Sequence, residues 1–309
     1  MKQREYSFPS STNLGDIHAD MWLPEGEIKA IVQISHGMAE YGLRYKDFAE
    51  YLCGNSVAVV VADHMGHGKS FDGKEENYGY FGSENGHAHL ADDQAKLTDI
   101  VKNDYPGVPY ILFGHSMGSF LARTLIIRYP EAYNAAVISG TGNQGAALVN
   151  GGLFMGNLIT GLMGAHHYSK LLNNLAFGSY NKIYENPKTD YDWLSRDEAN
   201  VQKYIDDPLC GFIPSCSLFR DMMTGVKFIT NKKNLTKMNK NMPVYFMSGS
   251  MDPVGECGKG VEKAYNNFIE AGMNDVSIKL YPEGRHEMLN EINKKEVYSD
   301  VLAWLNSKI

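Results

Sequence analysis

Short, almost uninterrupted apolar runs alternate with amphipathic stretches along most of this chain. Apolar runs of this length are typical of strands that are buried on both faces of a parallel sheet. Strands are predicted at 4–10, 19–25, 30–37, 57–64, 110–115, 135–141, 243–250 and 276–283. The amphipathic stretches predict helices at 43–55, 89–105, 118–130, 259–272 and 294–308.

This alternation predicts an α/β fold in which right-handed crossovers build a doubly wound sheet. One interval, from 143 to about 225, lacks buried strands and is too long for a plain loop between two strands. We therefore expect a core formed by residues 1–142 and 226–309, with an inserted helical cap at 143–225.

Composition narrows the class of protein. The chain has 309 residues, 43% of them hydrophobic, and a formal net charge of −7. An acidic chain with no dense Lys/Arg patch argues against nucleic-acid binding.

Three features predict a cytoplasmic location. The N-terminus lacks the apolar run of a signal peptide. The apolar stretch at 151–165 is expected to be too short to span a bilayer. The four cysteines form no CxxC pair, so reduced thiols are expected.

The segment YILFGHSMGSFLA at 110–122 places Ser116 between two glycines, where a predicted strand meets a predicted helix. A G-x-S-x-G pattern at such a turn is typical of an exposed serine nucleophile. Gly114 and Gly118 remove β-carbons that would collide at so sharp a turn. The alternative is a plain helix cap, because Gly and Ser are common where helices begin.

A serine hydroxyl needs a base that accepts its proton, and the base needs an anion that fixes its tautomer. His286 follows the last predicted strand, and Asp252 follows the strand before it. The chain has ten histidines, and Asp before Pro is common in turns, so the position after a strand is what singles out these two residues. The pattern predicts that Ser116, Asp252 and His286 meet at the carboxyl edge of the sheet.

Acyl transfer also requires donors for the oxyanion. The Met117 amide, directly after Ser116, is one candidate. The second is the Met38 amide, because Gly37 lets the loop after strand 30–37 turn sharply beside the substrate. The alternative is that His36 and Gly37 only end a strand.

Several segments resemble the monoacylglycerol lipase and lysophospholipase group of α/β-hydrolases, which is also described as serine-aminopeptidase-like. They are SHGMAEYGLRYKDFAEYL (35–52), VVADHMGHGKS (60–70), LFGHSMGS (112–119), LSRDEANVQKYIDDPLCGF (194–212), MSGSMDPVGE (247–256) and LYPEGRHEMLNE (280–291). The order Ser, Asp, His along the chain is also that of α/β-hydrolases. The resemblance implies an α/β-hydrolase fold with a mostly parallel eight-stranded sheet, flanking helices and a helical cap. It also implies Ser116 as nucleophile, His286 as base and Asp252 as its partner, with no cofactor.

The resemblance further places Glu40 and Arg44 near the site, where they can support the oxyanion loop or a polar headgroup. A structural ion pair is the alternative. Gly37 and His115 are also expected beside the substrate.

Two histidine-rich segments raise the question of a metal site. Asp63, His64 and His67, or the segment 87–93, carry ligand types that suit a metal. Neither segment has an established metal spacing, so no metal is expected.

The first part of the cap carries Leu153, Leu158 and Leu162 at helical spacing. Such a stripe is ordinarily buried core. In a cap over a hydrolase site it can instead line an acyl tunnel or contact a lipid surface. We place these leucines in the substrate-binding set.

The expected function is hydrolysis of carboxylic esters with hydrophobic acyl chains, through an acyl-enzyme on Ser116. The expected partner is a small, lipid-like ester, with transient membrane contact through the cap. A lysophospholipase is an alternative, as is an aminopeptidase-type amide hydrolase, since 185–207 is rich in acidic residues. A non-catalytic ligand-binding protein is least favoured, because it predicts that one of the three residues is missing.

Overall fold

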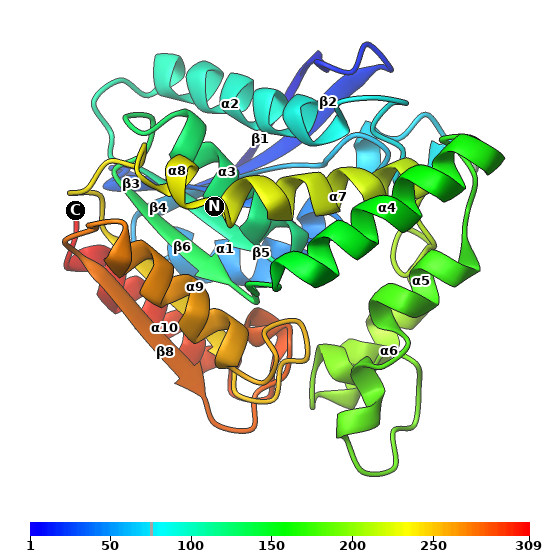
Figure 1. The fold of residues 1–309 in the computed structure, drawn as a ribbon. Helices are drawn as coiled ribbons and strands as arrows, with labels where there is room; N and C mark the ends of the chain where they lie inside the picture. Colours follow the sequence, from blue (N-terminus) through cyan, green and yellow to red (C-terminus); the bar gives the residue numbers. More distant parts are fainter. Residues whose placement is uncertain (75–76) are drawn as a thin grey trace.

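The computed structural model describes residues 1–74 and 77–309, and the expected sheet forms in full. Its strands are β1 Lys2–Pro9, β2 Asp16–Leu23, β3 Ala30–Ser35, β4 Val57–Ala62, β5 Tyr110–His115, β6 Ala135–Ser139, β7 Val244–Gly249 and β8 Val276–Tyr281. They lie in the order β1-β2-β4-β3-β5-β6-β7-β8 (Figure 1). β2 is antiparallel to both of its neighbours, and β3 to β8 are parallel. The predicted strands and the mostly parallel sheet are confirmed.

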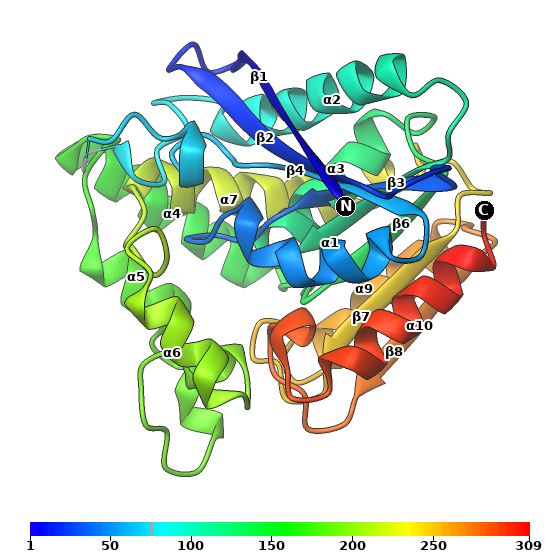
Figure 2. The same cartoon turned by 180° about the vertical axis from the view of Figure 1, so that it is seen from behind.

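Helices cover both faces of the sheet, which explains why its central strands are apolar throughout. Side chains that alternate along a strand point to opposite faces. Ile31 packs into one core cluster and Val32 into the other. The first face carries α2 Gly86–Asp104, α3 Met117–Arg128 and α9 Lys259–Glu270, and the second carries α1 Lys46–Cys53 and α10 Lys294–Asn306 (Figures 1 and 2). Short 3-10 turns are η1 Gly42–Tyr45, η2 Gly68–Ser70 and η6 Met288–Asn290.

The strand order reverses beside β3, and this reversal fixes where a site can form. From β3 the chain crosses to β4 on one side, and β5 then returns to pair on the other side. In parallel α/β sheets, ligands bind beyond the carboxyl ends of the strands at such a reversal. The loops after β3 and β5 therefore face each other across the expected site.

A long helical insertion lies between β6 and β7. It contains α4 Ala146–Met163, α5 Lys170–Phe177, η4 Tyr180–Ile183, η5 Asp192–Leu194, α6 Glu198–Asp206 and α7 Cys216–Ile229, and α8 Lys232–Leu235 follows. Figures 1 and 2 show α5 and α6 in a lobe beyond the edge of the main body. The side chains of Leu218, Val226 and Ile229 pack into the main core. The expected cap boundary at 225 is therefore inside a helix, because α7 packs on α3 and continues to Ile229.

The helix α4 is longer than its sequence pattern indicated. It begins at Ala146, before the apolar stretch at 151–165, and has 18 residues. By length and composition it could cross a membrane, and only 11% of it is buried. The expectation that this stretch is too short to span a bilayer was therefore wrong.

Candidate active site

Ser116 occupies a strained turn between β5 and α3. Its φ is 54° and its ψ is −123°, a backbone conformation that L-residues rarely adopt. A β-carbon on Gly114 would collide with the Gly118 carbonyl oxygen, and one on Gly118 would collide with the carbonyl oxygens of Ser35 and His36. Only glycine fits at both flanking positions, so the G-x-S-x-G pattern reflects the space available at this turn.

His286 and Asp252 form a buried hydrogen-bonded pair. The Nδ1 of His286 lies 3.0 Å from each carboxylate oxygen of Asp252. The same carboxylate accepts hydrogen bonds from the Ser248 hydroxyl at 3.0 Å and from the Val254 amide at 2.9 Å. A proton on Nδ1 leaves Nε2 as the basic nitrogen of the ring.

Asp252 also sets the basicity of the imidazole. Burial alone lowers the pKa of His286, but the charge of Asp252 and its hydrogen bond outweigh burial and raise it above its ordinary value. His115 packs against the same ring at 4.7 Å between centroids, and burial lowers its pKa to about 3. His115 therefore stays neutral, while His286 can take up a proton.

The loop after β3 is anchored on both sides of Met38. The Gly37 amide donates to Glu40 Oε1 at 2.5 Å, and the Ala39 amide donates to His67 Nε2 at 3.2 Å. Met117 is the first residue of α3, so its amide has no intrahelical acceptor. Met38 and Met117 lie beside Ser116, because all three line one cavity. The role of their amides as oxyanion donors stays a prediction.

Glu40 and Arg44 belong to a buried ion network behind the site. Arg44 Nη1 donates to Glu40 at 2.7 Å, and its two terminal nitrogens grip Glu287 at 2.6 and 2.7 Å. Burial raises the pKa of Glu40. Burial also opposes ionisation of Glu287, but the Arg44 charge and hydrogen bonds hold the pKa of Glu287 below its ordinary value. The network links the loop after β3 to Glu287, the residue that follows His286.

Asp63, His64 and His67, whose side chains are of types that suit a metal, make hydrogen bonds within the protein. The Asp63 carboxylate accepts the amides of Gly42 and Lys69, both at 2.7 Å. His64 and His67 are buried, and burial lowers their pKa values to about 3 and about 4. Both rings contact the backbone of the β3 loop, so these residues hold that loop in position.

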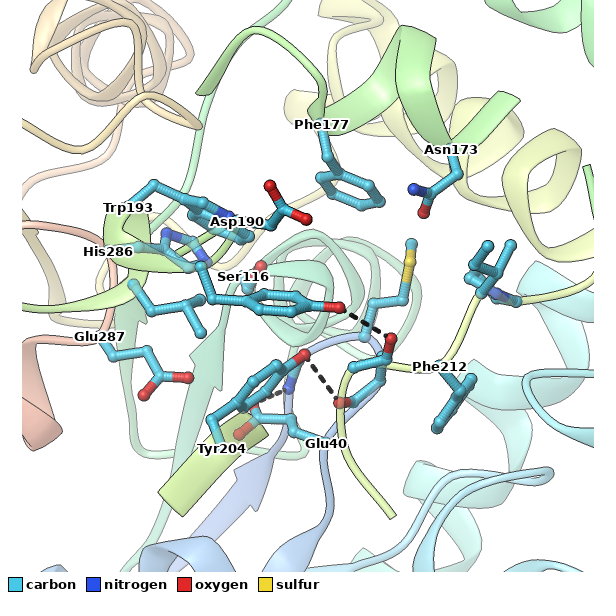
Figure 3. Close-up of a pocket in the computed structure, with 18 of the residues that line it drawn as sticks. Glu40, Ser116, Asn173, Phe177, Asp190, Trp193, Tyr204, Phe212, His286 and Glu287 are labelled. Carbon is cyan, nitrogen blue, oxygen red and sulfur yellow. Dashed lines mark hydrogen bonds between the residues drawn. The ribbon is translucent and has the colours of Figure 1, made fainter. Parts of the chain in front are cut away.

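Two cavities meet at Ser116. One, of about 400 Å³, has a mixed lining that includes Gly37, Glu40, His115, His286 and Glu287 beside aromatic and aliphatic side chains (Figure 3). We call it the polar cavity, because it is the more polar of the two. The other, of about 590 Å³, is mostly apolar and is walled by α4, α5 and α7. Met38, Ser116 and Phe177 line both cavities.

The cap leucines expected at the substrate lie elsewhere. Leu158 and Leu162 are 44% and 75% exposed, and Leu153 is partly buried against the main core. The α4 residues that line the apolar cavity are Ala147, Leu148, Gly151, Gly152 and Met155. The three leucines do lie in one helix, as their spacing predicts. Which face of that helix is turned to the cavity depends on how α4 packs against α7.

Sequence reasoning also missed residues of the insertion that lie at the candidate site. Trp193 packs on the His286 ring at 5.0 Å between centroids, and its carbonyl accepts the His286 amide at 3.2 Å. Tyr204 and Asp190 line the polar cavity (Figure 3). The family-like block at 194–212 includes Tyr204, and the acidic segment 185–207 includes Asp190, but neither pattern singles out Trp193.

The sheet and the turn at Ser116 define an α/β-hydrolase. The model of the family described as "Serine aminopeptidase, S33" matches residues 26–293. The chain belongs to this family.

Known relatives agree with the resemblance drawn from the sequence. The chain is 28% identical over 310 residues to a monoacylglycerol lipase of Mycolicibacterium smegmatis, covering 99% of this chain and 98% of that protein. It is 25% identical to human monoglyceride lipase, covering 93% and 86%. A carboxyl esterase structure from Bacillus coagulans superposes with a TM-score of 0.92 at 28% identity, covering 100% and 99%. The predicted similarity to monoacylglycerol lipases is confirmed.

We predict that Asp252→Asn lowers kcat for an ester substrate on the order of 10⁴-fold, because an amide cannot fix the imidazole tautomer. Only neutral His286 can act as a base, so kcat/KM falls as the pH drops through its pKa. The acid limb of the profile should move to lower pH in the variant, since the charge that raises this pKa is gone. Measuring kcat/KM between pH 5 and 9 tests both effects.

Asp99→Asn, on the exposed surface of α2, is the matched control. An Asp252→Asn enzyme with wild-type turnover and an unmoved acid limb would contradict this role.

Proposed function

We propose that the protein is a serine hydrolase that cleaves carboxylic esters of hydrophobic acyl chains, with monoacylglycerols as favoured substrates. The supporting observation is the position of Ser116 where an apolar and a polar cavity meet. An acyl chain in the apolar cavity and an alcohol in the polar one would bring the ester carbonyl to the Ser116 hydroxyl. The volumes, about 590 and 400 Å³, lie in the usual range of small-molecule sites.

The proposed chemistry has two halves. Ser116 Oγ attacks the carbonyl carbon while His286 Nε2 takes its proton, and the amides of Met38 and Met117 receive the oxyanion. The C–O bond then breaks, and the alcohol leaves with the proton from His286. Water attacks the acyl-enzyme by the same route and releases the fatty acid and Ser116. No cofactor enters either half.

The charges around the polar cavity favour an uncharged alcohol over a phosphate. Among the residues that the structure describes, its lining contains no Lys or Arg, but it does contain the carboxylates of Asp190, Glu40 and Glu287. Arg44 lies behind this wall with its donors committed to two glutamates. A glycerol group can donate hydrogen bonds to such a lining, whereas a phosphodiester would be repelled. The relatives named monoacylglycerol lipase and monoglyceride lipase fit this preference, which ranks a lysophospholipase lower.

A second candidate, hydrolysis of amides that carry a free amine, is favoured by one residue. Asp190 comes from the insertion, lines the polar cavity and is drawn near Trp193 and Phe177 in Figure 3. Its carboxylate would suit an ammonium group. We rank this function second, because the large apolar cavity has no role in it.

We further propose that the segment 143–225 acts as a cap whose outer face touches lipid surfaces for short periods. The exposed apolar side chains of α4 and α5 that do not line the apolar cavity support this, including Phe154, Leu162 and Leu171. Apolar faces of this kind bind at membrane interfaces. We propose a cytoplasmic location for the protein, which the four free cysteines fit.

We expect the double variant Phe154→Glu, Leu162→Glu to sediment less with phosphatidylcholine vesicles that contain monoacylglycerol. The two carboxylates would have to enter the interface together with the apolar face. Ile269→Glu, at an exposed apolar position on α9, is the control and should sediment like the wild type. Equal sedimentation of all three proteins would contradict membrane contact through α4.

For the substrate, we expect wild-type kcat/KM to be higher for 1-palmitoylglycerol than for palmitoyl lysophosphatidylcholine or proline p-nitroanilide. Gly151 lines the apolar cavity, and a β-carbon there has nothing within 4 Å. Gly151→Leu should therefore fill acyl space and lower kcat/KM for palmitate esters at least about tenfold relative to butyrate esters.

Gly161→Leu is the matched control, because Gly161 lies on the same helix, is equally open and does not line the cavity. Faster turnover of the lysophospholipid or the amide would reject the favoured headgroup. An unchanged chain-length preference in Gly151→Leu would reject the placement of the acyl chain.

A further inference from the structure

Ala39, in the oxyanion loop, has a backbone conformation that its side chain disfavours. Its φ is 54°, in the left-handed region, and the residue is 6% exposed. Glycine adopts this region freely, whereas a residue with a β-carbon does so at a cost in energy. Such strain persists only where the surroundings hold the backbone in place.

Three hydrogen bonds hold the Ala39 backbone. Its N–H donates to His67 Nε2 at 3.2 Å, on the core side. Its carbonyl oxygen accepts two hydrogen bonds from the insertion, from the Tyr204 hydroxyl at 3.0 Å and from the Gly211 amide at 3.0 Å. Figure 3 draws the bond from the Tyr204 hydroxyl as a dashed line.

The two donors from the insertion are themselves well fixed. Tyr191 donates its hydroxyl to the Gly211 carbonyl at 3.0 Å, and its ring packs on Tyr204 at 5.2 Å between centroids. The Arg44 guanidinium lies 4.8 Å from the centre of the Tyr204 ring. The Phe212 ring packs at 5.1 Å on His67. The insertion therefore fixes the carbonyl oxygen of Ala39, while His67 fixes its N–H.

We propose that Tyr204 is a positioning residue, through which α6 keeps the oxyanion loop in its strained form and the Met38 amide in place. Without the two bonds from the insertion, only His67 would hold Ala39, and the backbone would relax toward negative φ. A change of φ at Ala39 turns the Met38–Ala39 peptide and, with it, the Met38 residue whose amide precedes that peptide. This relaxation therefore displaces the proposed oxyanion donor. The position of α6 against the oxyanion loop and the rate of reaction at Ser116 are therefore coupled. This inference rests on the proposed function, since the coupling is expressed in ester hydrolysis.

The test is a cycle of four enzymes: wild type, Tyr204→Phe, Ala39→Gly and the double variant. Phenylalanine keeps the ring against Arg44 and Tyr191 and removes only the hydroxyl. We expect Tyr204→Phe to lower kcat for p-nitrophenyl butyrate about fivefold, the value of one hydrogen bond, with KM changed less than about twofold. In the Ala39→Gly background the same change should cost less than about twofold, because glycine needs no restraint at positive φ.

A trifluoromethyl ketone, whose adduct with Ser116 places an oxyanion at the Met38 amide, should lose affinity in parallel with kcat. Tyr129→Phe, which removes a hydroxyl bonded to Asp92 at 2.8 Å on the surface, is the control and should leave both readouts unchanged. Thermal unfolding of each variant separates misfolding from repositioning.

Equal losses in the two backgrounds, or no loss at all, would overturn the coupling. A wild-type protein that does not turn over the ester would instead contradict the proposed function.

Discussion

The site depends on one close approach, between the start of α3 and the end of β3. Gly118 lies so near the carbonyls of Ser35 and His36 that no β-carbon fits. This contact brings the turn that carries Ser116 against the loop that carries Met38, although 77 residues separate them. The strained φ of Ser116 and the neighbouring amides both follow from it. A larger residue at 118 would separate the two loops and dismantle the site without touching any reacting group.

Around this contact, burial and neighbouring charges determine which titratable groups are charged and which are neutral. One carboxylate, Asp252, is satisfied by His286, Ser248 and Val254, and it keeps the imidazole basic. The Arg44 guanidinium joins Glu40 to Glu287 through three hydrogen bonds and so links the two loops beneath the site. The buried His64 and His67 rings stay neutral and serve as hydrogen-bonding supports. Buried polar groups of this kind are tolerated because each finds partners, and a satisfied network fixes a single geometry.

Much of the core could be predicted from local pattern, because strand periodicity and the G-x-S-x-G turn are set by neighbouring residues. The residues after β7 and β8 were predictable for the same reason, since position after a strand locates a side chain at the sheet edge. The insertion was different. Leu158 and Leu162 have the right spacing but face outward, because α7 decides which side of α4 is covered. Trp193 and Tyr204 reach the site only after the insertion folds back, and no local pattern encodes that contact.

The central claim, that Ser116 is a nucleophile activated by His286, is tested most directly by labelling with a fluorophosphonate probe, followed by mass spectrometry of the digested protein. The account predicts one phosphonylated peptide, modified at Ser116, in the wild type, and no labelling in His286→Ala at the same probe concentration. Labelling of a different residue, or undiminished labelling of Ser116 without His286, would contradict it.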